Sequence, residues 1–418
     1  MYEKNMRNLE KRIDEAEEWM ASCINLIASE NVISERVADV LSKPKLAGKY
    51  AERSRKKDRS KHYYYKGTKY IEKTEDELEK HLKLLFGCKN VEIRPISGTL
   101  ANDIVFSAFV NHKDRVMAYP TNHGGHISHY KHGSLGKYSK KIIPIPLTED
   151  GYHLDSSKTI KLVREYKPSI IVLGKSLFLF PEPISGIKEA CNKTGTKIVY
   201  DASHVLGLIA GKRFQNPLAE GADIVTGSTH KTFFGTQRGI IFSNMEDDEW
   251  IKIEKATFPG ALSNHHLNTL TGLLKATYEM LEFGREYAKQ TIINAKTLAS
   301  KLYESGFDVQ AKKFGFTESH HVAVDLSRYG GGERAASLLE ENNIIINSNM
   351  LPFEEQKYCK DPRGARIGVQ EMTRFGMKES EMGYIATLIS KCLHGKNVRE
   401  EVIEFRKDFQ DIKYCFDS

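Results

Sequence analysis

Between about residues 74 and 276, short apolar runs alternate along the chain with amphipathic stretches. Helical patterns such as SSKTIKLVREY (156–166) and GIKEACNKTG (186–195) separate the runs. The runs are RVMAYP (115–120), KIIPIPL (141–147), SIIVLG (169–174), KIVYD (197–201), ADIVTG (222–227) and GIIFSN (239–244). Each is apolar nearly throughout, which is typical of a strand buried on both faces. Strands that alternate with helices predict an α/β fold in which helices cover both faces of a mostly parallel sheet.

The pattern changes after about residue 276. A long helix is expected over 278–306, and strands are expected at HHVAVDL (320–326) and NIIINSN (343–349) within a smaller α+β region. The first residues, 1–19, form a charged amphipathic pattern without the apolar core of a signal peptide. With 418 residues, the chain exceeds what one core usually supports. We therefore expect an N-terminal arm (1–50), a large cofactor-binding domain (51–276) and a small C-terminal domain (277–418).

Composition narrows the class of protein. No apolar run approaches the roughly 20 residues that a membrane span needs. Six cysteines are scattered without a C-x-x-C pair, which disfavours a zinc site or a disulfide framework and favours a reducing cytoplasm. The formal net charge of +7 permits an anionic ligand or a nucleic acid without requiring either.

The candidate chemistry lies where the expected strands end, because parallel sheets bind ligands beyond the carboxyl ends of their strands. Asp201 closes KIVYD, His204 follows it, and Lys231 comes thirty residues after Asp201, past the strand ADIV. Taken alone, Asp201 is an ordinary helix N-cap and Lys231 an ordinary solvated lysine. The combination is what points to a function.

Two further motifs accompany these strand ends. The turn Ser97-Gly98-Thr99 opens an apolar helix and offers backbone N–H groups, hydroxyls and the helix dipole to an anion. The stretch TNHGGHISHY (121–130) combines glycines with histidines, so rings can approach something flat. A metal site is the alternative, but no Asp, Glu or Cys with ligand spacing accompanies these histidines.

Pyridoxal phosphate needs all of these groups together. It requires a lysine for covalent attachment and a carboxylate against its pyridinium nitrogen. It also suits a helix N-terminus for its phosphate and an aromatic ring over its face. The lysine must be neutral to attack a carbonyl, and burial or a cationic neighbour lowers its pKa from about 10.4.

With these residues in place, the chain resembles the serine hydroxymethyltransferase family over nearly its whole length. The matching stretches are LIASEN (26–31), KYAE (49–52), SGTLAN (97–102), HGGH (123–126), DASHV (201–205), THKT (229–232), FPG (258–260) and ARIG (365–368). The resemblance implies a fold-type-I pyridoxal-phosphate enzyme of one-carbon metabolism that forms a homodimer with active sites at the subunit interface. It implies the transfer of the serine hydroxymethyl carbon to a tetrahydropterin, which leaves glycine.

The resemblance also implies roles for individual residues. Lys231 is expected to carry the cofactor, Asp201 to meet its ring nitrogen and His123 to stack on the ring. Ser97, Gly98 and Thr99 are expected to hold its phosphate, and Ser176 and His204 its phenolic oxygen. Ser29 and Arg366 fall at substrate-carboxylate positions, and Arg366 has the two-pronged donor geometry for that task. The remaining expected site residues are Glu52 as acid/base beside the pterin, Tyr50 reaching the partner's cofactor, the active-site Tyr65, and His230, which tunes the lysine.

Three stretches depart from the family pattern. RSRKKDRSKHY (53–63) replaces a shorter Gly-Tyr-Pro-Gly-Lys-Arg link, and is either a solvated charge run or a landing patch for an acidic pterin tail. Ser263 and Asn264 stand where a Gly-Gly usually donates to the other subunit's phosphate. TFFGTQRGI (232–240) is longer than the usual turn, with Arg238 in the arginine's place. The first two changes border the expected pterin site or subunit interface, and they favour a modified pterin, such as a methanopterin-type carrier, over ordinary folate.

Two other functions compete with this interpretation. A pyridoxal-phosphate aldolase acting on threonine-like 3-hydroxy amino acids needs the lysine, the aspartate and the arginine, but not Glu52 and the tyrosines that follow. A basic RNA-binding protein would explain the net charge, yet the chain carries no RNA-binding motif or aromatic-interleaved basic strand.

Overall fold

The computed structural model describes residues 2–56 and 60–417, so Lys57, Asp58 and Arg59 of the basic stretch lie outside the described residues. The α-helices are α1 (Tyr2–Ala21), α2 (Glu35–Leu41), α3 (Pro44–Ala47), α4 (Lys69–Phe86), α5 (Gly98–Phe109), α6 (Leu135–Tyr138), α7 (Ser156–Tyr166), α8 (Ile184–Thr194), α9 (Leu206–Ala210), α10 (Pro217–Glu220), α11 (Asp247–Lys255), α12 (Leu267–Glu304), α13 (Gly332–Glu340), α14 (Gln370–Arg374), α15 (Glu379–Leu393) and α16 (Arg399–Lys407). The strands are β1 (Ile24–Asn25), β2 (Arg53–Arg55), β3 (Lys61–Tyr63), β4 (Asn90–Glu92), β5 (Arg115–Ala118), β6 (Lys141–Pro144), β7 (Ile170–Leu173), β8 (Lys197–Asp201), β9 (Ile224–Ser228), β10 (Gly239–Ser243), β11 (Asp308–Val309), β12 (His321–Asp325), β13 (Ile344–Ile345), β14 (Asn347–Asn349) and β15 (Gly364–Gly368).

The chain divides into two compact units. The large unit comprises residues 29–289, 352–356 and 414–418, and the small unit comprises residues 1–28, 290–351 and 357–413. This division differs from the expected one (1–50, 51–276, 277–418) at both boundaries. Residues 1–28 join the small unit, where β1 pairs in parallel with β13. The second boundary falls inside α12, where a continuous helical pattern carries no composition signal for it.

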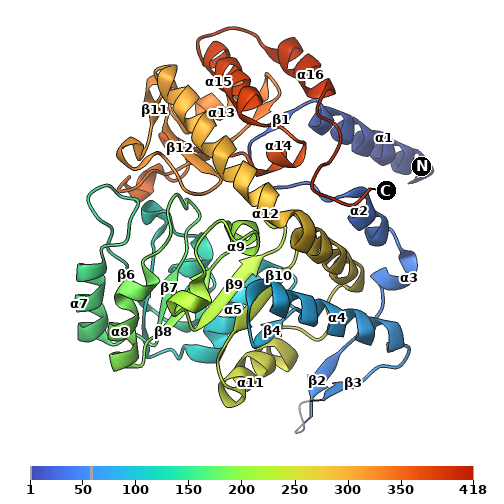
Figure 1. Cartoon of the computed structure of the whole chain (residues 1–418), viewed down its shortest axis with the longest axis vertical. Coiled ribbons are helices and arrows are strands. Elements are labelled where there is room, and N and C mark those ends of the chain that lie inside the picture. Colours follow the sequence, from blue (N-terminus) through green and yellow to red (C-terminus); the bar gives the residue numbers. More distant parts are fainter. Residues whose placement is uncertain (1, 57–59, 418) are drawn as a thin grey trace. The chain divides into compact units, whose positions relative to one another are not determined.

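The large unit is built on a seven-stranded sheet with the order β4-β10-β9-β8-β7-β5-β6. Strands β5 to β9 run parallel, and β10 is antiparallel to both of its neighbours. Strands β7, β8 and β9 lie side by side, with α5 and α8 against the sheet and α7 packed on α8 (Figure 1). Every residue of β7 and β9 is buried, as a strand covered by helices on both faces requires. The expected α/β fold with a mostly parallel sheet is therefore confirmed.

The small unit has an antiparallel sheet of order β11-β12-β15-β14 in addition to the β1–β13 pair. Its core includes side chains from β1, the second part of α12, β12, α13 and α15, among them Ile24, Leu298, Val322, Leu339 and Ile385. The strand expected at 320–326 is β12, and the one expected at 343–349 is split into β13 and β14.

In the described part of the chain, we find no helix that combines the length and the apolar character needed to cross a membrane.

The central strands give a first prediction. Ile171 of β7 has no exposed surface, so Ile171→Ala should lower the free energy of unfolding by about 2–5 kcal/mol, through lost burial and the cavity it leaves. The urea midpoint at constant slope measures this change. Leu84→Ala on α4 is the control, because Leu84 is 70% exposed and such surface changes stay within about 0.5 kcal/mol. Equal shifts in the two variants would contradict the assignment of β7 to the core.

Candidate active site

The carboxyl ends of β8 and β9 and the N-terminus of α5 meet at a cavity. Its lining combines two lysines, a carboxylate, three histidines, an amide and several hydroxyl groups. The lining residues are Gly98, Thr99, Asn102, His126, His129, Lys175, Asp201, Ser203, His204, Ser228 and Lys231. The structure therefore brings together five of the expected site residues: Gly98, Thr99, Asp201, His204 and Lys231.

Asp201 is a buried carboxylate with three hydrogen-bond donors. His129 Nε2 and Asn102 Nδ2 lie 2.8 and 2.7 Å from its Oδ2, and the Ser203 N–H donates to Oδ1 at 2.8 Å. Burial alone would raise the pKa of Asp201. The hydrogen bond and the charge of His129, together with the hydrogen bonds of Ser203 and Asn102, outweigh burial and hold this pKa well below its ordinary value. The carboxylate is thus charged, as a partner for a protonated ring nitrogen must be.

Asn102 also connects Asp201 to strand β9. Asn102 Oδ1 accepts a hydrogen bond from Thr226 of β9 at 2.6 Å, and Thr226 is the register partner of Asp201 between the two strands. The Nδ1 atom of His129 has no hydrogen-bond partner among the described residues. A donor on α5 and a ring from the 126–130 turn therefore fix the orientation of the carboxylate.

Lys231 lies just beyond β9, in a loop closed by its own backbone. The Thr229 N–H donates to Arg238 O at 3.0 Å, and the Gly235 N–H donates to Thr229 O at 2.8 Å. Asn31, in LIASEN, donates to the Lys231 carbonyl at 2.7 Å, and Lys231 is only 8% exposed. Burial, with the neighbouring charge of Lys231, lowers the pKa of His230 to about 4, so this ring is neutral near pH 7.

The Ser97-Gly98-Thr99 turn forms the start of α5. Ser97 caps the helix, because its Oγ accepts a hydrogen bond from the Leu100 N–H at 3.1 Å. A Cβ atom at Gly98 would lie 2.2 Å from the Ser228 Oγ, so only glycine leaves this wall open. The first N–H groups of a helix lack intrahelical acceptors and favour an anion. Together with the charged Asp201 and the buried Lys231, this cradle fits pyridoxal phosphate.

His123 is not among the residues that line the cavity, and His126 occupies the place expected for it. The His123 Nδ1 lies 3.1 Å from the Ile145 carbonyl oxygen, and its ring meets Phe353 edge-on at 5.7 Å. Between the two histidines, Gly124 adopts a positive φ of 79° and turns the backbone, so that His126 lines the cavity instead. Sequence spacing alone gave no means of choosing between the two rings.

Sequence reasoning missed six lining residues: Asn102, His126, His129, Lys175, Ser203 and Ser228. All of them stand within or beside motifs that drew attention, in SGTLAN, HGGHISH, LGKS, DASH and VTGS. Lys175, for example, precedes the expected Ser176, and its Nζ pairs with Glu182 at 3.3 Å and donates to the Tyr152 carbonyl at 2.9 Å. The Ser176 N–H donates to Gly124 O at 2.7 Å, but Ser176 itself is not among the lining residues.

Tyr50, Glu52 and Tyr65 do not line this cavity of their own chain. They flank the β2–β3 hairpin, in which the Tyr64 N–H donates to Glu52 O at 3.0 Å. The rings of Tyr50 and Tyr65 lie 5.0 Å apart and are 45% and 47% exposed. The two tyrosines are therefore exposed on the single chain, whereas Glu52 is partly buried.

The expected substrate-binding residues belong to different units. Ser29 is the first residue of the large unit, two positions before Asn31. Arg366 lies on β15 of the small unit, where its Nε and Nη2 donate to Asn347 Oδ1 at 3.3 and 3.2 Å. Burial lowers the pKa of Arg366 to about 10, which leaves it charged at neutral pH.

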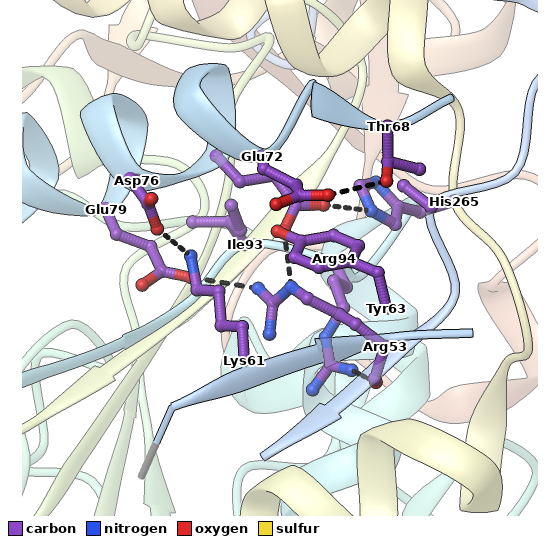
Figure 2. Close-up of polar contacts among 12 residues, drawn as sticks. Arg53, Lys61, Tyr63, Thr68, Glu72, Asp76, Glu79, Ile93, Arg94 and His265 are labelled. Atoms are coloured by element: carbon purple, nitrogen blue, oxygen red, sulfur yellow. Dashed lines mark hydrogen bonds and ion pairs between the residues drawn. The ribbon is translucent and has the colours of Figure 1, made fainter. Parts of the chain in front are cut away.

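The basic stretch is neither a plain solvated run nor wholly a landing patch, because three of its charges are paired inside the large unit. Arg53 binds Glu75 and Glu79, and Arg55 binds Glu254. Lys61 Nζ lies 2.6 Å from Asp76 and 3.0 Å from Glu79. In Figure 2, Arg53 and Lys61 point from the hairpin toward the acids of α4.

Comparison with known proteins agrees with this geometry. The family model described as serine hydroxymethyltransferase matches residues 3–389. The chain belongs to this family. It is 45% identical over 403 residues to the serine hydroxymethyltransferase of Archaeoglobus fulgidus, covering 96% of this chain and 90% of that one. The enzyme of the same name from Methanothermobacter marburgensis is 45% identical over 420 residues, covering 100% of this chain and 96% of that one.

The serine hydroxymethyltransferase family consists of fold-type-I transferases that depend on pyridoxal phosphate, and the large sheet of this chain has that architecture. A solved structure supports the assignment of the fold. The crystal structure of L-threonine transaldolase from Pseudomonas fluorescens superposes with a TM-score of 0.87 at 27% identity, covering 100% of this chain and 96% of that one.

The cradle at α5 gives a second prediction. In Gly98→Ala the new methyl group collides with the Ser228 Oγ, an overpacking cost of about 1–3 kcal/mol. We expect pyridoxal phosphate, titrated by its visible absorbance, to bind about ten-fold or more weakly. Adding Ser228→Gly to Gly98→Ala should restore part of the affinity. The control is Gly383→Ala, where the nearest atom is 4.0 Å from the new Cβ, and a loss of affinity as large as that of Gly98→Ala would contradict the steric explanation.

Proposed function

We propose that the chain transfers the hydroxymethyl carbon of serine to a tetrahydropterin and leaves glycine. The observation that carries this proposal is the charged, buried Asp201 at the end of β8, in one cavity with Lys231 beyond β9 and the open N-terminus of α5. Pyridoxal phosphate, when bound, supplies an electron sink for the carbon bond that breaks. Asp201 keeps its ring nitrogen protonated, and Lys231 holds it covalently.

Residues in and around the cavity complete the proposed cofactor site. Ser97, Gly98 and Thr99 hold the phosphate at the α5 N-terminus, and His126, rather than His123, covers the face of the ring. His204 and Ser176 serve the phenolic oxygen. Backbone N–H groups of Ser263 and Asn264 reach the phosphate of the partner subunit.

Substrate binding and proton transfer are assigned to charged and aromatic groups. Arg366 grips the serine carboxylate with two parallel N–H donors, and Ser29 adds a hydroxyl. Glu52 exchanges the proton beside the pterin, and Tyr65 borders the substrate. His230, neutral next to Lys231, positions the lysine without adding a charge.

The protein is proposed to work as a homodimer in the cytoplasm. Three expected site residues do not line the cavity of their own chain; they are Tyr50, Glu52 and Tyr65. We propose that they contribute to the cavity of the partner subunit. The exposed apolar residues of α1 repeat at helical spacing and supply a surface for a second copy; they are Tyr2, Met6, Leu9 and Ile13. Six free cysteines suit a reducing compartment.

The proposed pterin is a modified, methanopterin-type carrier. Support comes from residues 53–63, which lie between Glu52 and Tyr65 in the sequence, and from Ser263 and Asn264, because both places depart from the family pattern. Serine cleavage should therefore be faster with tetrahydromethanopterin than with tetrahydrofolate. Equal efficiency with tetrahydrofolate and every modified pterin would contradict this choice.

A pterin-independent aldolase remains the second candidate, favoured by the likeness to the transaldolase structure. Serine cleavage that does not change on adding any reduced pterin would decide for the aldolase.

The covalent anchor gives a third prediction. The purified protein should show the visible absorbance band of lysine-bound pyridoxal phosphate, and borohydride should abolish it. Lys231→Ala should lack the band and serine cleavage, because Lys231 supplies the proposed attachment. A colourless wild-type protein that takes up no added pyridoxal phosphate would overturn the proposal.

Subunit complementation gives a fourth prediction. Lys231→Ala and Glu52→Gln are each expected to lose pterin-dependent serine cleavage. Refolded together, they should recover part of it, because a mixed dimer joins the intact Lys231 of one subunit to the intact Glu52 of the other. The control pair is Lys231→Ala with Asp201→Asn, whose defects fall in the same cavity, so that their mixed dimers have no intact site. No recovery in the first mixture would place Glu52 and Lys231 in the same subunit's site.

A further inference from the structure

The segment that replaces the family's Gly-Gly contacts the stretch that carries Glu52. We name residues 49–56 and 60–65 the strap, because they hold KYAE, the strands β2 and β3, and Tyr65. We name residues 264–267 the clamp. Within the large unit, Asn264, His265 and Leu267 of the clamp each reach the strap or a residue that holds it.

Asn264 binds the strap through both ends of its side-chain amide. Its Oδ1 accepts a hydrogen bond from the Ala51 N–H at 3.1 Å, and its Nδ2 donates to the Lys49 carbonyl at 3.0 Å. One amide group thereby satisfies a backbone donor and a backbone acceptor two residues apart. This pairing fixes the position of the backbone immediately before Glu52.

His265 supports the strap from beneath, through Glu75 of α4. The His265 Nε2 lies 2.8 Å from Glu75 Oε1, and Glu75 Oε2 accepts hydrogen bonds from Arg53 and from the Tyr63 hydroxyl. Arg53 follows Glu52 directly, and Tyr63 faces Arg53 across the hairpin. Figure 2 shows Arg53, Tyr63 and His265 converging on α4.

The polarity of these contacts fits a neutral His265. The His265 Nδ1 lies 3.2 Å from Arg238 Nη2, which can only donate, so Nδ1 is the acceptor of this hydrogen bond. The ring proton is therefore on Nε2, which donates a hydrogen bond to Glu75. Burial lowers the pKa of His265, in agreement with the neutral form. The ring thus joins an arginine on one side to a carboxylate on the other without adding a charge.

Arg238 connects the clamp to the Lys231 loop. Its Nη1 donates to the His266 carbonyl at 2.8 Å and its Nη2 to the Ile93 carbonyl at 2.9 Å, and its backbone closes the loop at Thr229. Arg238 has no exposed surface. Leu267 adds an apolar contact with Ala51 and Tyr63. The strap is therefore held against the element that carries the proposed cofactor lysine.

We propose that Asn264 and His265 are positioning residues that hold Glu52 in place for its step with the pterin. This inference rests on the proposed function. Asn264 and His265 act through the strap and do not touch the substrate. Their loss should therefore impair the step that needs Glu52 more than it impairs the reaction that needs only Lys231, Asp201 and Arg366. Cleavage of a 3-hydroxy amino acid such as threonine, without pterin, reports on that second group.

The test measures both reactions in the cofactor-loaded dimer. In His265→Ala and in Asn264→Ala, kcat for pterin-dependent serine cleavage should fall relative to pterin-independent threonine cleavage, by up to about 100-fold for a displacement near 1 Å. The absorbance band of bound pyridoxal phosphate should remain. Alanine at position 264 keeps its backbone N–H, so a phosphate contact by that group is not removed.

Matched variants separate positioning from general destabilisation. His266→Ala removes the exposed neighbouring ring, and Asn268→Ala removes an amide that donates to Leu41 O instead of the strap; both should leave the ratio unchanged. His265→Gln, which keeps one donor and one acceptor, should recover part of the ratio lost in His265→Ala.

Each outcome decides between explanations. Unchanged ratios in both alanine variants, or parallel loss of both reactions together with the absorbance band, would overturn the positioning role. If His265→Ala does not fold, Asn264→Ala, which leaves the buried charges intact, decides alone. Wild-type serine cleavage that ignores pterin would refute the proposed function itself, before any variant is compared.

Discussion

The cavity depends on one carboxylate that stays charged although it is buried. An isolated anion inside a protein is costly, and Asp201 is stable there because His129, Asn102 and the Ser203 N–H all donate to it. These donors come from the 126–130 turn, from α5 and from the chain just past β8. The hydrogen bonds of Asp201 therefore connect β8, α5 and the 126–130 turn, which surround the proposed cofactor.

A second set of buried polar and charged groups joins the strap and the clamp to the loop that carries Lys231. Arg53, Glu75, His265 and Arg238 are each at most 2% exposed and are linked in series. Burying ion pairs gains little stability by itself, because desolvation offsets much of the attraction. What such a series does provide is geometric specificity, since each group has only one arrangement in which donors meet acceptors. Removing one member leaves its neighbours with unpaired buried charges.

Much of the fold and the centre of the site could be predicted from the sequence. Nearly continuous apolar runs predicted the strands of the parallel sheet. The ends of these strands located Asp201 and Lys231, because a parallel sheet gathers its carboxyl ends at one edge. The choice between His123 and His126 could not be made, since it depends on the turn at Gly124. The division inside α12 was hidden by an unbroken helical pattern. The partners of Arg53 and Lys61 were also hidden, because Glu75, Asp76 and Glu79 follow on a separate helix whose docking the local pattern does not encode.

The series from Arg53 to Arg238 also bears on how this protein can be recombined with its relatives. The hairpin, the clamp and the loop after Lys231 are far apart in the sequence. Each contributes a buried group with a hydrogen-bond partner in this series. A hairpin moved alone into a relative would bring Arg53 without Glu75. Replacing the hairpin of this chain alone would leave Glu75 without Arg53. The three stretches and Glu75 of α4 depend on one another, so a functional chimera would have to exchange all four together.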